Sequence, residues 1–127
     1  MPDPVEDLWP PEVGTTTVVP PLAILRRQAV ILGERTQNLI EGVVETMPQG
    51  DGFRQLFYIV APSFDYKYLL FEIRHGVIGY PVTAFARGGR DSWQLETQEQ
   101  FVRWLKEILA SEETKRVVGS LLAQVKA

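Results

Sequence analysis

Few side chains in this sequence could act as an acid, a base or a nucleophile at neutral pH. His75 is the single histidine and the chain has no cysteine, so no other side chain has an unperturbed titration near neutrality. His75 precedes Gly76 between two predicted strands, a pair typical of a two-residue hairpin turn. A hairpin tip rarely gathers catalytic partners, so we expect His75 to be an exposed turn residue.

Two carboxylates share one face of a predicted strand. Glu41 and Glu45 lie four residues apart and could flank a substrate or hold a hard cation. Two carboxylates alone are a weak signal, and Arg54 or Lys67 on a neighbouring strand could pair with them. We therefore predict a solvated, charge-paired strand face, with no metal ion and no cofactor.

A basic glycine loop offers a different chemistry. The tetrapeptide Arg87-Gly-Gly-Arg90 joins two guanidinium groups to flexible backbone amides, which suits a carboxylate or phosphate ligand. It does not match the GxxxxGK[ST] pattern of a P-loop, so a mobile surface loop is the competing interpretation. Together with Arg74 and Trp93, these arginines mark a candidate pocket between the sheet and the second helix.

Four tyrosines fall on predicted strands or strand ends. They are Tyr58, Tyr66, Tyr68 and Tyr80. We expect several of them on the sheet face opposite the helices, where they could contact a protein, stack bases or form a second core layer. The net charge of −3 and the lack of an RNP-like pattern disfavour nucleic acid, so a protein partner leads.

Residues 1–20 are predicted to form a proline-rich arm. Six of the nine prolines fall within residues 1–21, and each lacks the amide that a regular element would use. Inside the arm, Leu8 and Trp9 stand in an acidic run that resembles a short docking motif. The alternative is that both fold back onto their own domain. The β-branched run 15–19 could lie along a sheet edge.

The remaining residues, 21–127, are predicted to form one α+β domain. Apolar residues at spacings of three and four predict helices over 21–33, 97–110 and from 111 toward the C-terminus. Alternating patterns separated by turn residues predict four strands, at 39–46, 53–61, 66–74 and 77–87. The expected order is α-β-β-β-β-α-α, a four-stranded antiparallel meander with helices on one face.

Three stretches of the chain resemble a group of small uncharacterised bacterial proteins. They are ILRRQAVILGERTQNLIEGVV (24–44), FYIVAPSFDYKYLLFEIRHGVIGYPV (57–82) and TKRVVGSLLAQ (114–124). The resemblance covers about 100 residues from the first helix onward and excludes the arm. It implies a bacterial cytoplasmic origin and brings no activity or site residue.

The leading functional hypothesis is a noncatalytic protein-interaction domain, with an inhibitor or an immunity-type factor as one form of it. Its surface would be the aromatic and charged sheet face or Trp9 in the arm. The alternative is a small-ligand binding protein or weak enzyme with a pocket between sheet and helices, and a third hypothesis is self-association. Because the N-terminus lacks a basic and an apolar region and no run reaches ~20 apolar residues, we expect a cytoplasmic protein without a membrane segment.

Overall fold

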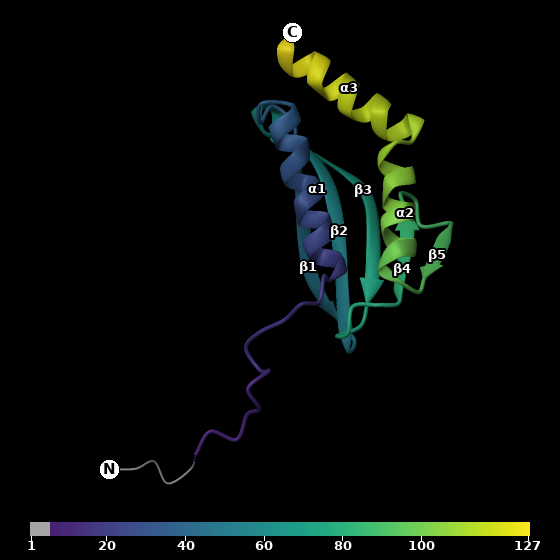
Figure 1. Ribbon diagram of the computed structural model, residues 1–127. Coiled ribbons are helices and arrows are strands. Elements are labelled where there is room, and N and C mark those ends of the chain that lie inside the picture. The colour runs from purple at the N-terminus through teal and green to yellow at the C-terminus, as the bar shows by residue number, and fades with distance from the viewer. Residues whose placement is uncertain (1–5) are drawn as a thin grey trace.

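The computed structural model describes residues 6–127, so the first five residues of the predicted arm lie outside the described part. Three helices and five strands follow the arm, with a short 3-10 turn at Pro62–Phe64 (Figure 1). Their order is α1 (Pro21–Arg35), β1 (Glu41–Gln49), β2 (Gly52–Ala61), β3 (Tyr66–His75), β4 (Val82–Ala86), β5 (Ser92–Leu95), α2 (Gln98–Leu109) and α3 (Glu112–Lys126). The predicted α+β class, with one N-terminal and two C-terminal helices, is confirmed.

Local sequence explains where the helices begin. Pro21 occupies the first turn of α1, where the amide that proline lacks would have no helical partner. Thr97 caps α2 by accepting a hydrogen bond from the amide of Gln100, and Ser111 caps α3 by accepting one from Thr114. Glu112 and Glu113 then complement the positive end of the α3 dipole.

The sheet is antiparallel and its strands pair in sequence order, β1-β2-β3-β4-β5. The prediction of four strands is wrong by one, because β5 pairs with β4 in a stretch that the sequence pattern left as loop. This strand has four residues and only Leu95 is buried, so it carries no alternating apolar pattern. Its backbone pairing with β4 holds it in the sheet.

The connection between β3 and β4 is also longer than predicted. The pair His75 and Gly76 does not form a two-residue hairpin, since β4 begins only at Val82. Residues 76–81 form the loop, and Pro81 lies directly before the strand instead of inside it. The missing proline amide is therefore not needed for the ladder.

One irregularity in β3 decides which side chains meet the helices. Phe57 pairs with Phe71, whereas the next residue, Tyr58, pairs with Leu69, so Leu70 is an extra residue in β3. Leu70 and Phe71 are both buried in the core cluster. The alternation of β3 is consequently reversed on the N-terminal side of Leu70.

All three helices lie on one side of the sheet, as Figure 1 shows. α1 covers β1 and β2, while α2 lies over the strands at the other edge and α3 crosses the upper end. The core lies between these layers, where Phe57 stacks on Phe71 at 5.1 Å and Phe71 meets the edge of Trp104 at 5.1 Å. The opposite surface of the sheet, here called the open face, carries no helix.

Candidate functional site

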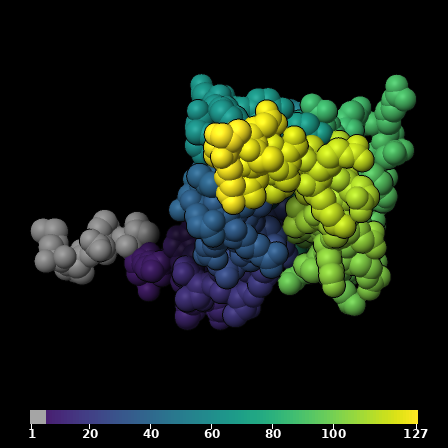
Figure 2. Space-filling model, turned by 90° about the horizontal axis from the view of Figure 1, so that it is seen from above, coloured from purple at the N-terminus to yellow at the C-terminus, as the bar shows by residue number. Residues whose placement is uncertain are grey.

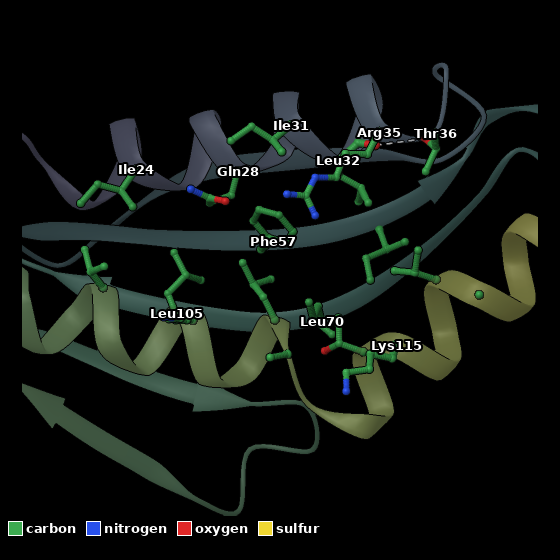
Figure 3. Close-up of a pocket in the computed structure, with 18 residues that line it drawn as sticks. Ile24, Gln28, Ile31, Leu32, Arg35, Thr36, Phe57, Leu70, Leu105 and Lys115 are labelled. Atoms are coloured by element: carbon green, nitrogen blue, oxygen red, sulfur yellow. Dashed lines mark hydrogen bonds between the residues drawn. The ribbon is translucent and has the colours of Figure 1, made fainter.

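A cavity of about 840 Å³ lies between the helices on the covered side of the sheet. We call it the groove. One wall is α1, the other is formed by α2 and the first two turns of α3, and the floor comes from β2 and β3 (Figure 3). The residues that line it are Ile24, Gln28, Ile31, Leu32, Arg35, Thr36, Phe57, Ile59, Leu70, Val102, Leu105, Lys106, Leu109, Ala110, Thr114, Lys115, Val118 and Gly119. Seen from above, α3 crosses the end of the molecule near α1 (Figure 2).

The floor of the groove is apolar and buried. Phe57, Ile59 and Leu70 are only 2%, 1% and 4% exposed. Side chains from the two walls therefore cover the floor. An extended chain or an acyl chain that entered the groove would lie against apolar side chains.

The closed end of the α1 wall is held by Thr36, which is buried just after the helix. Its hydroxyl lies 2.7 Å from the carbonyl oxygen of Ile40 and 3.1 Å from the Ile40 amide. The Leu32 carbonyl oxygen lies 3.0 Å away. The hydroxyl thus satisfies both backbone groups of Ile40 where the chain turns from α1 into β1.

The charges at the groove have one sign. Arg35, Lys106 and Lys115 line it, and no aspartate or glutamate of the described residues 6–127 does. Lys115 pairs with Glu112 at 3.3 Å, whereas Arg35 and Lys106 form no ion pair within residues 6–127. In Figure 3, Gln28 and Arg35 extend from α1 toward the facing wall. The groove therefore combines an apolar floor with two unpaired cations.

A polar contact joins α3 to the sheet beside the groove. The Tyr68 hydroxyl donates to the Glu113 carboxylate at 2.8 Å, and the Arg87 guanidinium lies 4.2 Å from the centre of the Tyr68 ring. Burial, followed by the hydrogen bond to Glu113, raises the pKa of Tyr68 above its ordinary value of 10.0. Tyr68 thus ties the beginning of α3 to β3.

The open face carries charged side chains that pair with one another. Glu72 accepts from Arg54 at 2.8 and 3.0 Å and from Arg74 at 2.8 Å. Burial opposes ionisation of Glu72, but its hydrogen bonds with the two arginines and their positive charges outweigh burial and lower the pKa of its carboxyl. Beneath this cluster, Leu56 is buried although its strand face carries no helix.

The predicted charge pairing of Glu45 is confirmed for one of its two candidate partners. Lys67 donates to Glu45 at 2.8 Å and lies 4.3 Å from the centre of the Tyr58 ring. Arg54 pairs with Glu72 instead. Among residues 6–127 no cluster of three or more aspartate, glutamate or histidine residues is arranged to hold a metal ion.

The four tyrosines do not share one face of the sheet, which corrects the expected aromatic surface. Tyr58 lies on the open face, opposite Leu69 of β3. Tyr66 and Tyr68 pair with Ala61 and Ile59, on the side that faces the helices. The cause is the extra residue at Leu70, which reverses the alternation in this half of β3.

Tyr80 lies outside the sheet, in the loop before β4. Its ring meets Phe101 of α2 at 6.4 Å, and its hydroxyl donates to the Val19 carbonyl oxygen at 3.3 Å. Burial raises the pKa of Tyr80. Its structural role is to join α2, this loop and the arm.

The residues of the predicted basic pocket are separated in the structure. Arg74 lies over the Phe85 ring on the open face, Arg87 lies over Tyr68, and Arg90 is exposed in the turn before β5. Trp93 packs against Trp104 at 6.0 Å on the covered side. None of these four residues lines the groove, which lies between α1 and the two C-terminal helices.

His75 ends β3 and is partly buried instead of lying exposed in a turn. Its Nδ1 lies 2.9 Å from the Gly76 carbonyl oxygen, and its Nε2 lies 3.1 Å from Nε2 of the buried Gln55. The Gln55 side-chain oxygen accepts from the Thr46 hydroxyl at 2.6 Å. This arrangement satisfies a buried amide and brings no carboxylate to the imidazole.

The described part of the arm, residues 6–20, has no strand or helix, so the edge strand expected over 15–19 is not formed. It leaves the first turn of α1 and extends away from the helices and sheet (Figure 1). Leu8 is 81% exposed and Trp9 is 73% exposed, so the alternative in which they fold onto their own domain is wrong.

Sequence reasoning missed the groove, although α1 carries a signal for it. Ile24, Gln28, Ile31 and Arg35 follow a spacing of three and four beside the predicted stripe that contains Leu25 and Ala29. Ile24 and Ile31 broaden the apolar face of α1 beyond what one contact with the sheet requires. A face of this width indicates a second surface along the helix.

No protein-family model matches this chain, and no curated protein or solved structure matches it. The resemblance to small bacterial proteins therefore stays a prediction. Within the part of the chain that the structure describes, no helix has both the length and the apolar character to span a membrane.

Proposed function

We propose that this chain is a noncatalytic protein-interaction domain, and that the groove binds an extended, apolar and acidic peptide segment of its partner. The observation that carries the proposal is the groove itself, an apolar slot of about 840 Å³ lined by cations and no carboxylate. Apolar side chains of the peptide would enter between the walls, and its acidic residues would meet Arg35 and Lys106.

The open face supports partner binding less well. Its most buried carboxylate, Glu72, already accepts hydrogen bonds from both Arg54 and Arg74. A partner on this face would have to desolvate paired charges, and such pairs add little net affinity. Tyr58 is already covered by Lys67. We therefore assign the interaction to the groove and not to the face that the sequence favoured.

A small apolar acid is the second candidate ligand, because the groove falls within the size range of small-molecule sites, about 300–1,000 Å³. Its acyl part would lie over Ile59 and Leu70, and its carboxylate would meet Arg35 or Lys106. An inhibitor or immunity-type role and a bacterial cytoplasmic setting stay part of the first proposal, since both concern the identity of the partner.

Selection of displayed random peptides against the purified chain tests the proposal. We expect selected peptides to combine apolar and acidic residues, and their NMR shift changes to map to amides around Val102, Lys106 and Gly119. The V102E variant should lose binding at least about tenfold, since a charge would enter an apolar contact. The matched control T83E adds the same charge to the open face and should bind normally.

Three outcomes would count against this assignment. Shift changes confined to the open face, around Tyr58 and Phe85, would move the interaction there. Failure to select any peptide, together with groove-mapped binding of a medium-chain fatty acid, would favour the second candidate. Binding of neither probe would remove both.

A further inference from the structure

The arm has the composition that the groove selects. Between residues 6 and 20 it carries Glu6, Asp7 and Glu12 and no lysine or arginine. Its apolar side chains include Leu8 and Trp9, which are largely exposed and do not pack against their own domain. A segment with acidic and apolar residues complements the apolar, cationic lining of the groove.

The reach of this segment also fits. α1 is 15 residues long and so spans about 22 Å. Residues 6–13 would span about 26 Å once the turn between Pro10 and Val13 opens on docking, so Leu8 and Val13 could then occupy opposite halves of the groove. Glu6 and Asp7, which precede Leu8, and Glu12, which precedes Val13, would then lie near Arg35 and Lys106.

The junction with α1 directs the arm away from its own groove. Pro20 has an extended backbone, with φ −75° and ψ 160°, and each residue that precedes a proline is confined to extended conformations. Val19 and Pro20 both precede prolines, and Tyr80 donates to the Val19 carbonyl oxygen. A tight reversal that would lay the arm back along α1 is therefore disfavoured.

A reversal of the arm farther from α1 does not bring Leu8 and Trp9 to the groove of the same chain either. The amides of Val13 and Thr15 donate to Pro10 and Glu12, so the chain already turns between 10 and 15. Beyond that turn, residues 6–9 would span only about 13 Å. This is shorter than the length of the six extended residues from Thr15 to Pro20 that lead to α1. Leu8 and Trp9 would stop before Ile24, where the groove begins.

We infer that the groove of one copy of this chain receives the arm of a second copy, with residues 6–13 as the docked segment. This inference rests on the proposed function and names its occupant. Two chains that exchange arms would form a closed dimer with two equivalent contacts. In each contact, an arm with three carboxylates meets a groove with two cations, Arg35 and Lys106, that form no ion pair within residues 6–127.

Sedimentation of the full chain over a range of concentrations tests the inference. We expect a monomer–dimer equilibrium for the unmodified chain. The arm variant L8D/W9D and the groove variant V102E should each shift it toward monomer by about tenfold or more. The controls V77D and Q94E add the same type of charge at exposed positions outside the arm and the groove, and should dimerise normally.

Mixing the two variants gives the sharpest result. The chain with the altered arm keeps an intact groove, and the chain with the altered groove keeps an intact arm. One arm can then dock into one groove, so the mixture should form a 1:1 heterodimer that neither variant forms with itself. Circular dichroism verifies that each variant is folded, and K106E replaces V102E if that variant is not.

The inference is overturned if the unmodified chain stays monomeric, if the arm variant still dimerises, or if the mixed variants do not associate. A monomeric chain that nevertheless binds selected peptides in the groove would remove the second copy as occupant and leave the proposed function standing. If the chain neither dimerises nor binds selected peptides in the groove, the groove is not a binding surface.

Discussion

A Cβ atom placed on Gly42 would lie 2.5 Å from the Cα atom of Ala29 and 2.7 Å from its Cβ atom. α1 therefore contacts β1 through backbone, with no space for a side chain between them. This close approach sets the position of α1 over the sheet. Because α1 is one wall of the groove, the pair also determines how far apart the two walls stand.

The G42A substitution should destabilise the domain by about 1–3 kcal/mol, since the added methyl group must push α1 outward. Urea denaturation followed by circular dichroism measures the change. The matched control is G119A in α3, where no atom lies within 4 Å of the added methyl group. Alanine there should stabilise the helix by about 0.5–1 kcal/mol. Equal effects at both positions would contradict the contact.

The T36V substitution keeps the shape of the side chain but removes the hydroxyl that serves Ile40. Leaving both the amide and the carbonyl of Ile40 without this partner should cost about 1–3 kcal/mol of unfolding free energy. T36S keeps the hydroxyl and should retain more stability than T36V. A larger loss in T36S would show that the Thr36 methyl group matters more than its hydrogen bonds.

Ionisation of Glu72 makes the free energy of unfolding depend on pH. Its folded pKa is lowered, so its stabilising contribution is complete above its ordinary pKa of 4.5 and is lost as the pH falls through the folded value. E72Q should therefore lower the free energy of unfolding by about 1–2 kcal/mol at pH 7, and the difference from the unmodified chain should shrink at pH 3. Denaturation at both pH values measures it.

The control for this prediction is E45Q, which removes one charge of the exposed Lys67–Glu45 pair. Surface pairs contribute little, so we expect a clearly smaller change at pH 7 than the one caused by E72Q. An E72Q effect of the same size at pH 7 and pH 3 would exclude ionisation of Glu72 as its source.

The Y68F substitution should loosen the start of α3. It removes the hydroxyl that donates to Glu113, which is worth about 0.5–1.5 kcal/mol for an ordinary hydrogen bond. Amides in the first turns of α3 should exchange hydrogen faster, while those of α1 should not change. Y66F is the control, because Tyr66 forms no hydrogen bond through its hydroxyl within residues 6–127. Unchanged exchange in α3 would show that the bond does not hold the helix.

Local patterns predicted the helices well, because each helix carries its own signals. The apolar spacing, the prolines before α1 and the caps Thr97 and Ser111 all act within a few residues of the helix they start. The four longer strands were predicted for the same reason, although the fourth was placed too early. β5 was missed, since a short edge strand is stabilised by pairing with β4 and not by its own side chains.

The candidate site was harder to predict, as the tyrosines show. Strict alternation placed Tyr66 and Tyr68 with Arg74 on the open face, but a single extra residue at Leu70 moved both tyrosines to the side of the sheet that faces the helices. A bulge is favoured when it improves packing across the sheet, so one strand read alone does not reveal it. The separation of Arg87 from Trp93 follows in the same way from how α2 and α3 dock.

By itself, the sequence determined the element types, the order of the meander, the single core and the acidic, proline-rich arm, because these depend on composition and on spacing within short segments. Only the tertiary structure decided that α1 stands apart from α2 and α3, which side chains face the space between them, and that Arg35 and Lys106 both line it. These features arise from contacts between residues far apart in the chain, such as Gly42 with Ala29, and such contacts leave no local pattern.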